Sequence, residues 1–98
     1  MRTIVDLTPI NLGRDPEFIL QASELAGMQV IVATGAYYTT DTYFSMRQGA
    51  ELTELFVDDI ERGIGVSGVR AGVIKCATEP AMDRYNERLL RASARAHR

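Results

Sequence analysis

With 98 residues, the chain has room for one modest domain, and 46% hydrophobic with 24% charged residues is ordinary globular usage. A formal net charge of −2 gives no electrostatic basis for binding nucleic acid or an anionic membrane surface. Cys76 is the only cysteine, which excludes an internal disulfide and fits an intracellular setting. No secretory signal follows Met1, and no apolar run reaches the roughly 18 residues of a membrane span. These features predict a cytoplasmic protein.

The first half of the chain alternates strand and helix patterns. The β-branched run 3–8 predicts a strand, and Asp15 followed by Pro16 predicts the start of a helix that ends at Gly27. Apolar residues at helical spacing mark one face of this helix: Phe18, Ile19, Ala22 and Leu25. The continuous apolar run 29–34 is typical of a strand covered on both faces of a parallel sheet.

A long connection is expected from Gly35 to about Gly49, which is more than a plain turn between elements needs. Its length indicates a functional role, the alternative being that its aromatic residues only pack the loop onto its own framework. These residues are Tyr37, Tyr38, Tyr43 and Phe44.

The second expected helix spans about residues 50–64. Its apolar stripe consists of Leu52, Leu55, Phe56, Ile60 and Ile64. Its acidic residues off the stripe are Glu51, Glu54, Asp58 and Glu61. We interpret these acidic residues as a solvated face and not as catalytic carboxylates.

The segment 68–78 predicts a short parallel strand that carries a lysine at its end. Alternation places Ala71, Val73 and Lys75 on one face. A lysine in this position usually extends into solvent, because an unpaired buried charge is costly. In a closed site, however, a neutral amine could form a Schiff base with a carbonyl substrate, or take up carbon dioxide as a carbamate that bridges two metal ions.

A last helix is expected from about Arg84 to Ala96, with Asp83 as its cap. Its apolar face consists of Tyr85, Leu89, Ala92 and Ala96. His97, the only histidine, lies at the end of this helix, where a cation interacts favourably with the helix dipole. It lacks the histidine or cysteine partners of a zinc site, so we interpret it as structural.

Three strand–helix units predict an α/β fold with parallel strands and right-handed crossovers. A doubly wound sheet and part of a (β/α)8 barrel both fit this order. No Gly-x-Gly-x-x-Gly follows either of the first two strands, so the dinucleotide-binding form of the sheet lacks its signature. A full barrel takes roughly 250 residues, and this chain has room for three of its eight units.

Six phrases in order and spacing resemble the phosphotriesterase family of the amidohydrolase superfamily, which includes phosphotriesterase-like lactonases. The phrases are Val5-Asp-Leu-Thr8, Leu12-Gly-Arg-Asp15, Ala33-Thr-Gly35, Ile60-Glu-Arg-Gly-Ile64, Gly68-Val-Arg-Ala-Gly-Val-Ile-Lys75 and Asn86-Glu-Arg-Leu-Leu-Arg-Ala-Ser-Ala-Arg-Ala-His97. The resemblance implies that residues 1–98 are an internal fragment of a single metal-dependent hydrolase barrel, covering its strands 2 to 4.

The resemblance also implies a site. The family holds two divalent metal ions, usually zinc, and Lys75 stands where its carboxylated, metal-bridging lysine ends the fourth strand. Tyr37 stands where lactonase-like members carry a tyrosine, so it is expected to contact a small-molecule lactone, carboxyl ester or phosphotriester. The family's other metal ligands, His-x-His on strand 1, histidines on strands 5 and 6 and an aspartate on strand 8, belong to segments this chain does not contain. Asp83-Arg84 also replaces the Thr-Pro that relatives often carry.

Three functions therefore remain open from the sequence. The first is a metal-dependent hydrolase of ester bonds with Lys75 as carboxylated bridge, the 98-residue chain alone being inactive. The second is a Schiff-base aldolase that uses the same lysine. The third is a non-catalytic truncated fragment or remnant that docks onto a partner. With three strands, the sheet is also expected to self-associate through its open edges.

Overall fold

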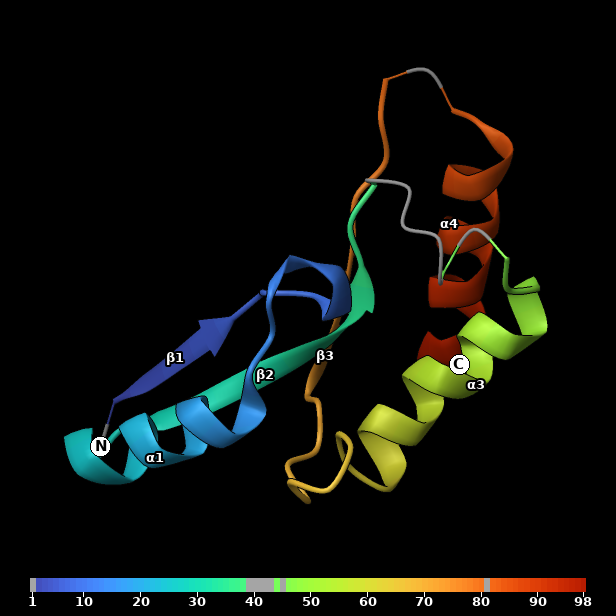
Figure 1. Cartoon of the computed structure of the whole chain (residues 1–98). Coiled ribbons are helices and arrows are strands. Elements are labelled where there is room, and N and C mark those ends of the chain that lie inside the picture. Colours follow the sequence, from blue (N-terminus) through green and yellow to red (C-terminus); the bar gives the residue numbers. More distant parts are fainter. Residues whose placement is uncertain (1, 39–43, 45, 81) are drawn as a thin grey trace.

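The computed structural model describes residues 2–38, 44, 46–80 and 82–98; Tyr43, expected in the aromatic connection, lies outside these residues. Three parallel strands alternate with helices (Figure 1). The elements are β1 (Thr3–Asp6), the 3-10 turn η1 (Ile10–Leu12), α1 (Pro16–Ala26), β2 (Gln29–Ala36), α3 (Gly49–Glu61), β3 (Val73–Cys76) and α4 (Arg84–His97). Within this part of the chain, no helix is long and apolar enough to cross a membrane.

The sheet has the order β1-β2-β3, and both pairs are parallel, which confirms the expected βα topology. β2 is longer than its neighbours and pairs with them in succession. Thr3 to Asp6 lie beside the first half of β2, with Asp6 opposite Val32. Val73 to Cys76 lie beside the second half, from Ala33 onward. The strands are therefore staggered, as the closure of a sheet into a barrel requires.

Both predicted ends of α1 and the predicted cap of α4 are confirmed. Asp15 accepts a hydrogen bond from the N–H of Phe18 at 3.1 Å, and α1 ends at Gly27 with a left-handed backbone. Asp83 caps α4 by accepting from the N–H of Asn86 at 2.7 Å. That backbone hydrogen bond, aided by the side-chain amide of Asn86, lowers the pKa of Asp83 below its usual value.

Several predicted boundaries are wrong, and local hydrogen bonds explain the differences. β1 stops at Asp6 because the Asp6 carboxylate accepts hydrogen bonds from the N–H and hydroxyl of Thr8, two residues further along the chain. β2 continues through Gly35 to Ala36, so the expected irregular connection is shorter at its start. α3 ends at Glu61 because the N–H groups of the next two residues both turn back onto the carbonyl of Asp58. The lysine strand is regular only over residues 73–76.

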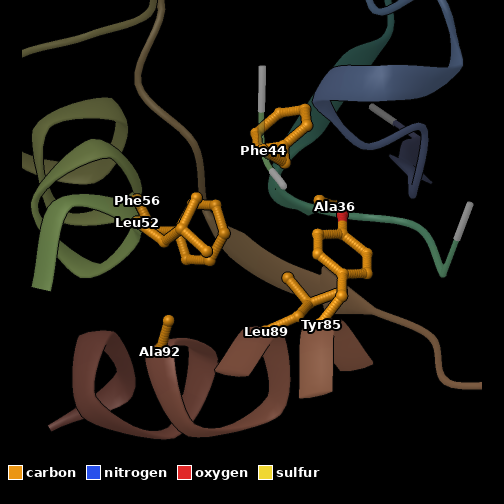
Figure 2. Packing of buried hydrophobic residues seen from close by; sticks show 7 residues of the cluster. All are labelled: Ala36, Phe44, Leu52, Phe56, Tyr85, Leu89 and Ala92. Carbon is orange, nitrogen blue, oxygen red and sulfur yellow. The ribbon is translucent and has the colours of Figure 1, made fainter. Parts of the chain in front are cut away.

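The main hydrophobic core lies between α3, α4 and the end of β2. Its buried residues are Ala36, Phe44, Leu52, Phe56, Tyr85, Leu89 and Ala92. Figure 2 shows the side chains of α3 and α4 pointing toward one another, with Phe44 and Ala36 beside them. The predicted stripe of α4 is thus confirmed as the face that packs, and so is that of α3 except at Ile64, which lies beyond the end of the helix and packs in a second cluster. The acidic residues of α3 that were expected to be solvated are exposed.

A second cluster lies under the first half of β2 and contains Val32, Ile64 and Ala71. Ile19 of α1 packs against it, but the rest of the expected apolar face of α1 is open. Phe18 is 64% exposed and Leu25 is 91% exposed. The physical reason is that α1 lies beside the two-stranded end of the sheet, where its main packing partner is β2.

A buried polar network joins these layers. Asp59 of α3 accepts hydrogen bonds at one carboxylate oxygen from the guanidinium of Arg14, at 2.8 Å, and from the hydroxyl of Thr34, at 2.7 Å. Side-chain exposures of 11% for Arg14 and 6% for Asp59 make this a buried ion pair. Because each charge is compensated only by the other and by fixed hydrogen bonds, removing one partner leaves an uncompensated buried charge.

We expect Asp59→Ala to lower the free energy of unfolding by about 3–5 kcal/mol, because it strands the buried Arg14 guanidinium. The matched control is Asp58→Ala, which removes the neighbouring carboxylate from an exposed pair with Arg62 and should cost no more than about 1 kcal/mol. Urea denaturation of the two variants measures the difference. Equal losses in both would contradict the structural role of the buried pair.

Candidate functional site

The end of β3 places Lys75 on the face of the sheet opposite to the helices. Cys76 packs against the core formed with α3 and α4, and successive side chains of a strand point to opposite faces. Lys75 therefore points away from the helical layer, as does Val73. The predicted face-sharing of Ala71 with these two residues is wrong: Ala71 precedes the regular strand and packs with Val32 in the second cluster.

Gly35 allows the backbone of Lys75 to approach unusually closely. The two residues are partners in the parallel register, and Gly35 has a φ of +101°. A Cβ atom at position 35 would lie 2.0 Å from the carbonyl oxygen of Lys75. Only glycine meets both conditions, because it lacks the Cβ atom and tolerates this backbone conformation. Gly35 is thus the local reason that the lysine lies where it does.

Tyr37 follows directly after β2, at the same edge of the sheet. Because Gly35 pairs with Lys75, Tyr37 lies two residues beyond the partner of Lys75. Its ring stacks in a tilted arrangement on that of Tyr38, with centroids 4.4 Å apart. Its backbone is bonded to the side chain of Asn11. The structure therefore brings the two predicted site residues to the carboxyl ends of neighbouring parallel strands, the edge where barrel enzymes place their chemistry.

No complete metal site accompanies Lys75. Across residues 2–38, 44, 46–80 and 82–98, no three histidine, cysteine, aspartate or glutamate side chains converge in a way that could hold an ion. His97 ends α4 and lines a hollow with Gly72 and Val73, toward the start of β3 and not its end. His97 is exposed and lies apart from the edge that carries Lys75.

The sequence analysis missed two polar residues that support this part of the sheet, one on α3 and one beside Tyr37. Asp59 lies on the same helical stripe as Leu52 and Phe56, and a carboxylate on a buried stripe is a signal that a partner exists. Asn11 lies in a turn that the sequence did not predict, and its contact with Tyr37 spans 26 residues. No local pattern indicates such a contact.

The sequence matches the model of the Phosphotriesterase family over residues 1–98. A phosphotriesterase homology protein of Mycobacterium tuberculosis (strain ATCC 25618 / H37Rv) is 43% identical over 106 residues, covering 98% of this chain and 32% of that protein. The aryldialkylphosphatase of Saccharolobus solfataricus is 36% identical over 101 residues, covering 100% of this chain and 32% of that protein.

Two solved structures superpose with a TM-score of 0.89 at 38% identity. One is a mutant organophosphorus hydrolase from Deinococcus radiodurans, covering 98% of this chain and 32% of that one. The other comes from engineering organophosphate hydrolysis activity from a weak promiscuous lactonase template, covering 99% and 33%. The chain spans about a third of the length of these relatives, and its three βα units correspond to part of a TIM barrel.

The close approach at Gly35 leads to a test. Gly35→Ala should be strongly destabilising and should displace β3, because the added methyl group meets the Lys75 carbonyl and the positive φ alone costs about 1–3 kcal/mol. Gly13→Ala is the matched control, since Gly13 also has a positive φ, +82°, but nothing lies within 4 Å of its Cβ position. The measurements are urea unfolding and the rate of amine labelling at Lys75. If both variants lose the same stability and label Lys75 at the unchanged rate, the close approach has no role in placing the lysine.

Proposed function

The chain belongs to the phosphotriesterase family, and from that premise we propose that it forms part of a metal-dependent hydrolase that acts on ester bonds. The observation that carries the proposal is the position of Lys75. It lies at the carboxyl end of its strand, on the helix-free face, with its backbone seated against Gly35. Members of this family are metal-dependent hydrolases, which supports the reaction class.

We propose a small-molecule lactone, carboxyl ester or phosphotriester as substrate. One relative is named as an aryldialkylphosphatase, and one similar structure derives from a lactonase template with organophosphate hydrolysis activity. These names support an ester centre, at carbon or phosphorus, as the bond that is cleaved. A cytoplasmic location belongs to the same proposal, because Cys76, the only cysteine, is free.

The residues of this chain fit one part of a dinuclear metal centre. A carboxylated Lys75 would offer two oxygen atoms, which suit a bridge between two hard or borderline cations such as zinc. Zinc takes four ligands in its usual geometry, and the described residues supply no histidine or carboxylate cluster to complete it. The remaining ligands would come from other strands of an intact barrel.

A bound metal pair supplies a Lewis acid and lowers the pKa of bound water toward neutrality. The contribution of this chain is to prepare and hold the bridge. In its unprotonated form, the amine of Lys75 would add to the carbon of carbon dioxide. A C–N bond forms while one C=O π bond passes its electron pair to oxygen, and one N–H bond breaks and releases its proton to solvent, which leaves a carbamate anion. The backbone pairing with Gly35 then fixes where this anion lies relative to the end of β2.

Tyr37 is proposed to contact the substrate. It follows the strand next to that of Lys75, so an ester bound at the lysine would lie beside the same edge. A phenolic hydroxyl can donate a hydrogen bond to a carbonyl or phosphoryl oxygen and so orient it.

We further propose that the 98-residue chain alone self-associates. β1 and β3 each pair on one side only within the three-stranded sheet, and each open side presents unpaired backbone groups. The exposed side chains of Phe18 and Leu25 add apolar surface.

In an intact barrel that carries this segment, Lys75→Ala should abolish most hydrolysis and reduce metal content, because the bridging anion is lost. Lys75→Glu should retain part of both, since glutamate also offers two oxygen atoms. Metal stoichiometry and lactone hydrolysis measure the two effects. An alanine variant with two bound ions and full activity would disprove the role of Lys75. Trapping of substrate on Lys75 by borohydride would instead support a Schiff-base mechanism.

For the 98-residue chain by itself, we expect a solution mass above that of the 10.9 kDa monomer, no dinuclear metal centre and no hydrolysis. Light scattering, metal analysis and a lactone assay make the three measurements. A monomer that holds two zinc ions and turns over substrate would contradict the proposal.

A further inference from the structure

β2 extends beyond β1, and side chains continue the pairing where β1 stops. β1 ends at Asp6, opposite Val32, while β2 runs on to Ala36. The N–H of Gly72 donates to the carbonyl of Val32 from the β3 side. Successive carbonyls of a strand point to alternate sides, so the carbonyls of Ala33 and Tyr37 point toward the β1 side.

Side chains from the segment after β1 bind both of these carbonyls. Arg14 donates from its guanidinium to the carbonyl of Ala33 at 3.1 Å. Asn11 donates from its amide nitrogen to the carbonyl of Tyr37 at 3.3 Å. The same Asn11 side chain accepts from the N–H of Tyr37 at 2.8 Å through its amide oxygen.

The Asn11 side chain thus takes the place of one residue of a neighbouring antiparallel strand, whose own N–H and C=O would exchange two hydrogen bonds with Tyr37. A primary amide carries a donor and an acceptor side by side, and both are used on a single residue, as in a sheet. Tyr85 of α4 adds a longer hydrogen bond, with its hydroxyl 3.4 Å from the carbonyl of Tyr37. The backbone of Tyr37 is therefore held from two elements that are distant in the sequence.

We infer that Asn11 is a positioning residue that fixes the backbone of Tyr37 and thereby aims its side chain at the substrate. The inference rests on the proposed role of Tyr37, but the hydrogen bonds themselves do not. Because the hold is on the backbone, it acts on the path of the chain at position 37 and reaches the phenol hydroxyl only through that path. It determines where the chain leaves the sheet after β2, and hence the point from which the Tyr37 side chain extends.

The test is hydrogen exchange of backbone amides in the 98-residue chain, resolved to single residues. The N–H of Tyr37 should be protected, and Asn11→Ala should accelerate its exchange about tenfold, the effect of one lost hydrogen bond. Asn11→Asp keeps an oxygen that accepts from this N–H but loses the donor to the carbonyl, so its exchange should fall between the other two. Amides in the middle of α4, such as that of Leu89, should not change.

The control is Asn86→Ala, which removes a buried asparagine of the same size whose hydrogen bonds go to Asp83 and Glu79 and not to Tyr37. In this variant, the exchange rate of the Tyr37 amide, compared with that of the core amides of the same variant, should be as low as in the unsubstituted chain. An unprotected Tyr37 amide in the unsubstituted chain would overturn the inference. Equal acceleration of every amide in Asn11→Ala would also overturn it, because that result indicates general destabilisation.

Kinetics in an intact barrel separate this inference from the proposed function. Tyr37→Phe should lower kcat/KM for a lactone several-fold if the hydroxyl contacts substrate. Asn11→Ala should then cost less in the Tyr37→Phe background than in the parent, because both changes act through one group. Unchanged kinetics in Tyr37→Phe would refute the role of Tyr37 but not the hold by Asn11. A loss in Tyr37→Phe with strictly additive losses in the double variant would refute the action of Asn11 through Tyr37.

Discussion

The buried carboxylate of Asp59 is the constraint on which the arrangement of the other elements depends. Its side chain binds Arg14 from the segment after β1 and Thr34 from β2, while it stands on α3 itself. Its backbone carbonyl also accepts from the N–H of Ala71, just before β3, at 2.9 Å. One residue of α3 is thus hydrogen-bonded to the segment after β1, to β2 and to the segment before β3. A buried charge is tolerable only when such partners are all in place, so this geometry disfavours alternative packings of the helix on the sheet.

This arrangement also connects the core to the edge where the candidate site lies. Thr34 precedes Gly35 in β2, and Gly35 meets the backbone of Lys75. Any shift of α3 along the sheet would pull on Thr34 and so disturb the close approach beside the lysine. The site is therefore supported by a polar network on the helical face of the sheet, although the lysine points from the opposite face. The hydrophobic clusters supply most of the burial, but they are less selective about register than a directional ion pair.

The sequence was sufficient to predict the order of strands and helices, the capping residues Asp15 and Asp83, and the apolar faces of α3 and α4. These features follow from local spacing and local hydrogen bonds, which a single sequence displays. The extension of β2 through Gly35 and the loss of regularity around Ala71 depend on contacts with another strand, so they could not be predicted. For the candidate site, Lys75 and Tyr37 were proposed from the resemblance to the family and not from local spacing. The supporting contacts of Asn11 and Asp59 span 26 and 45 residues, and no spacing rule covers them.

The side chains that complete the edge of β2 have a consequence for how this barrel segment can diverge. Backbone hydrogen bonds between strands are little affected by most substitutions, because every residue except proline offers the same N–H and C=O groups. Where the side chains of Asn11 and Arg14 supply these hydrogen bonds in place of a neighbouring strand, a single substitution at either position removes them. Mutation can therefore change the point at which the chain leaves β2 more easily than it can change the pairing of the strands. Such a protein can keep its sheet during evolution while the conformation of the segment beside the candidate site changes.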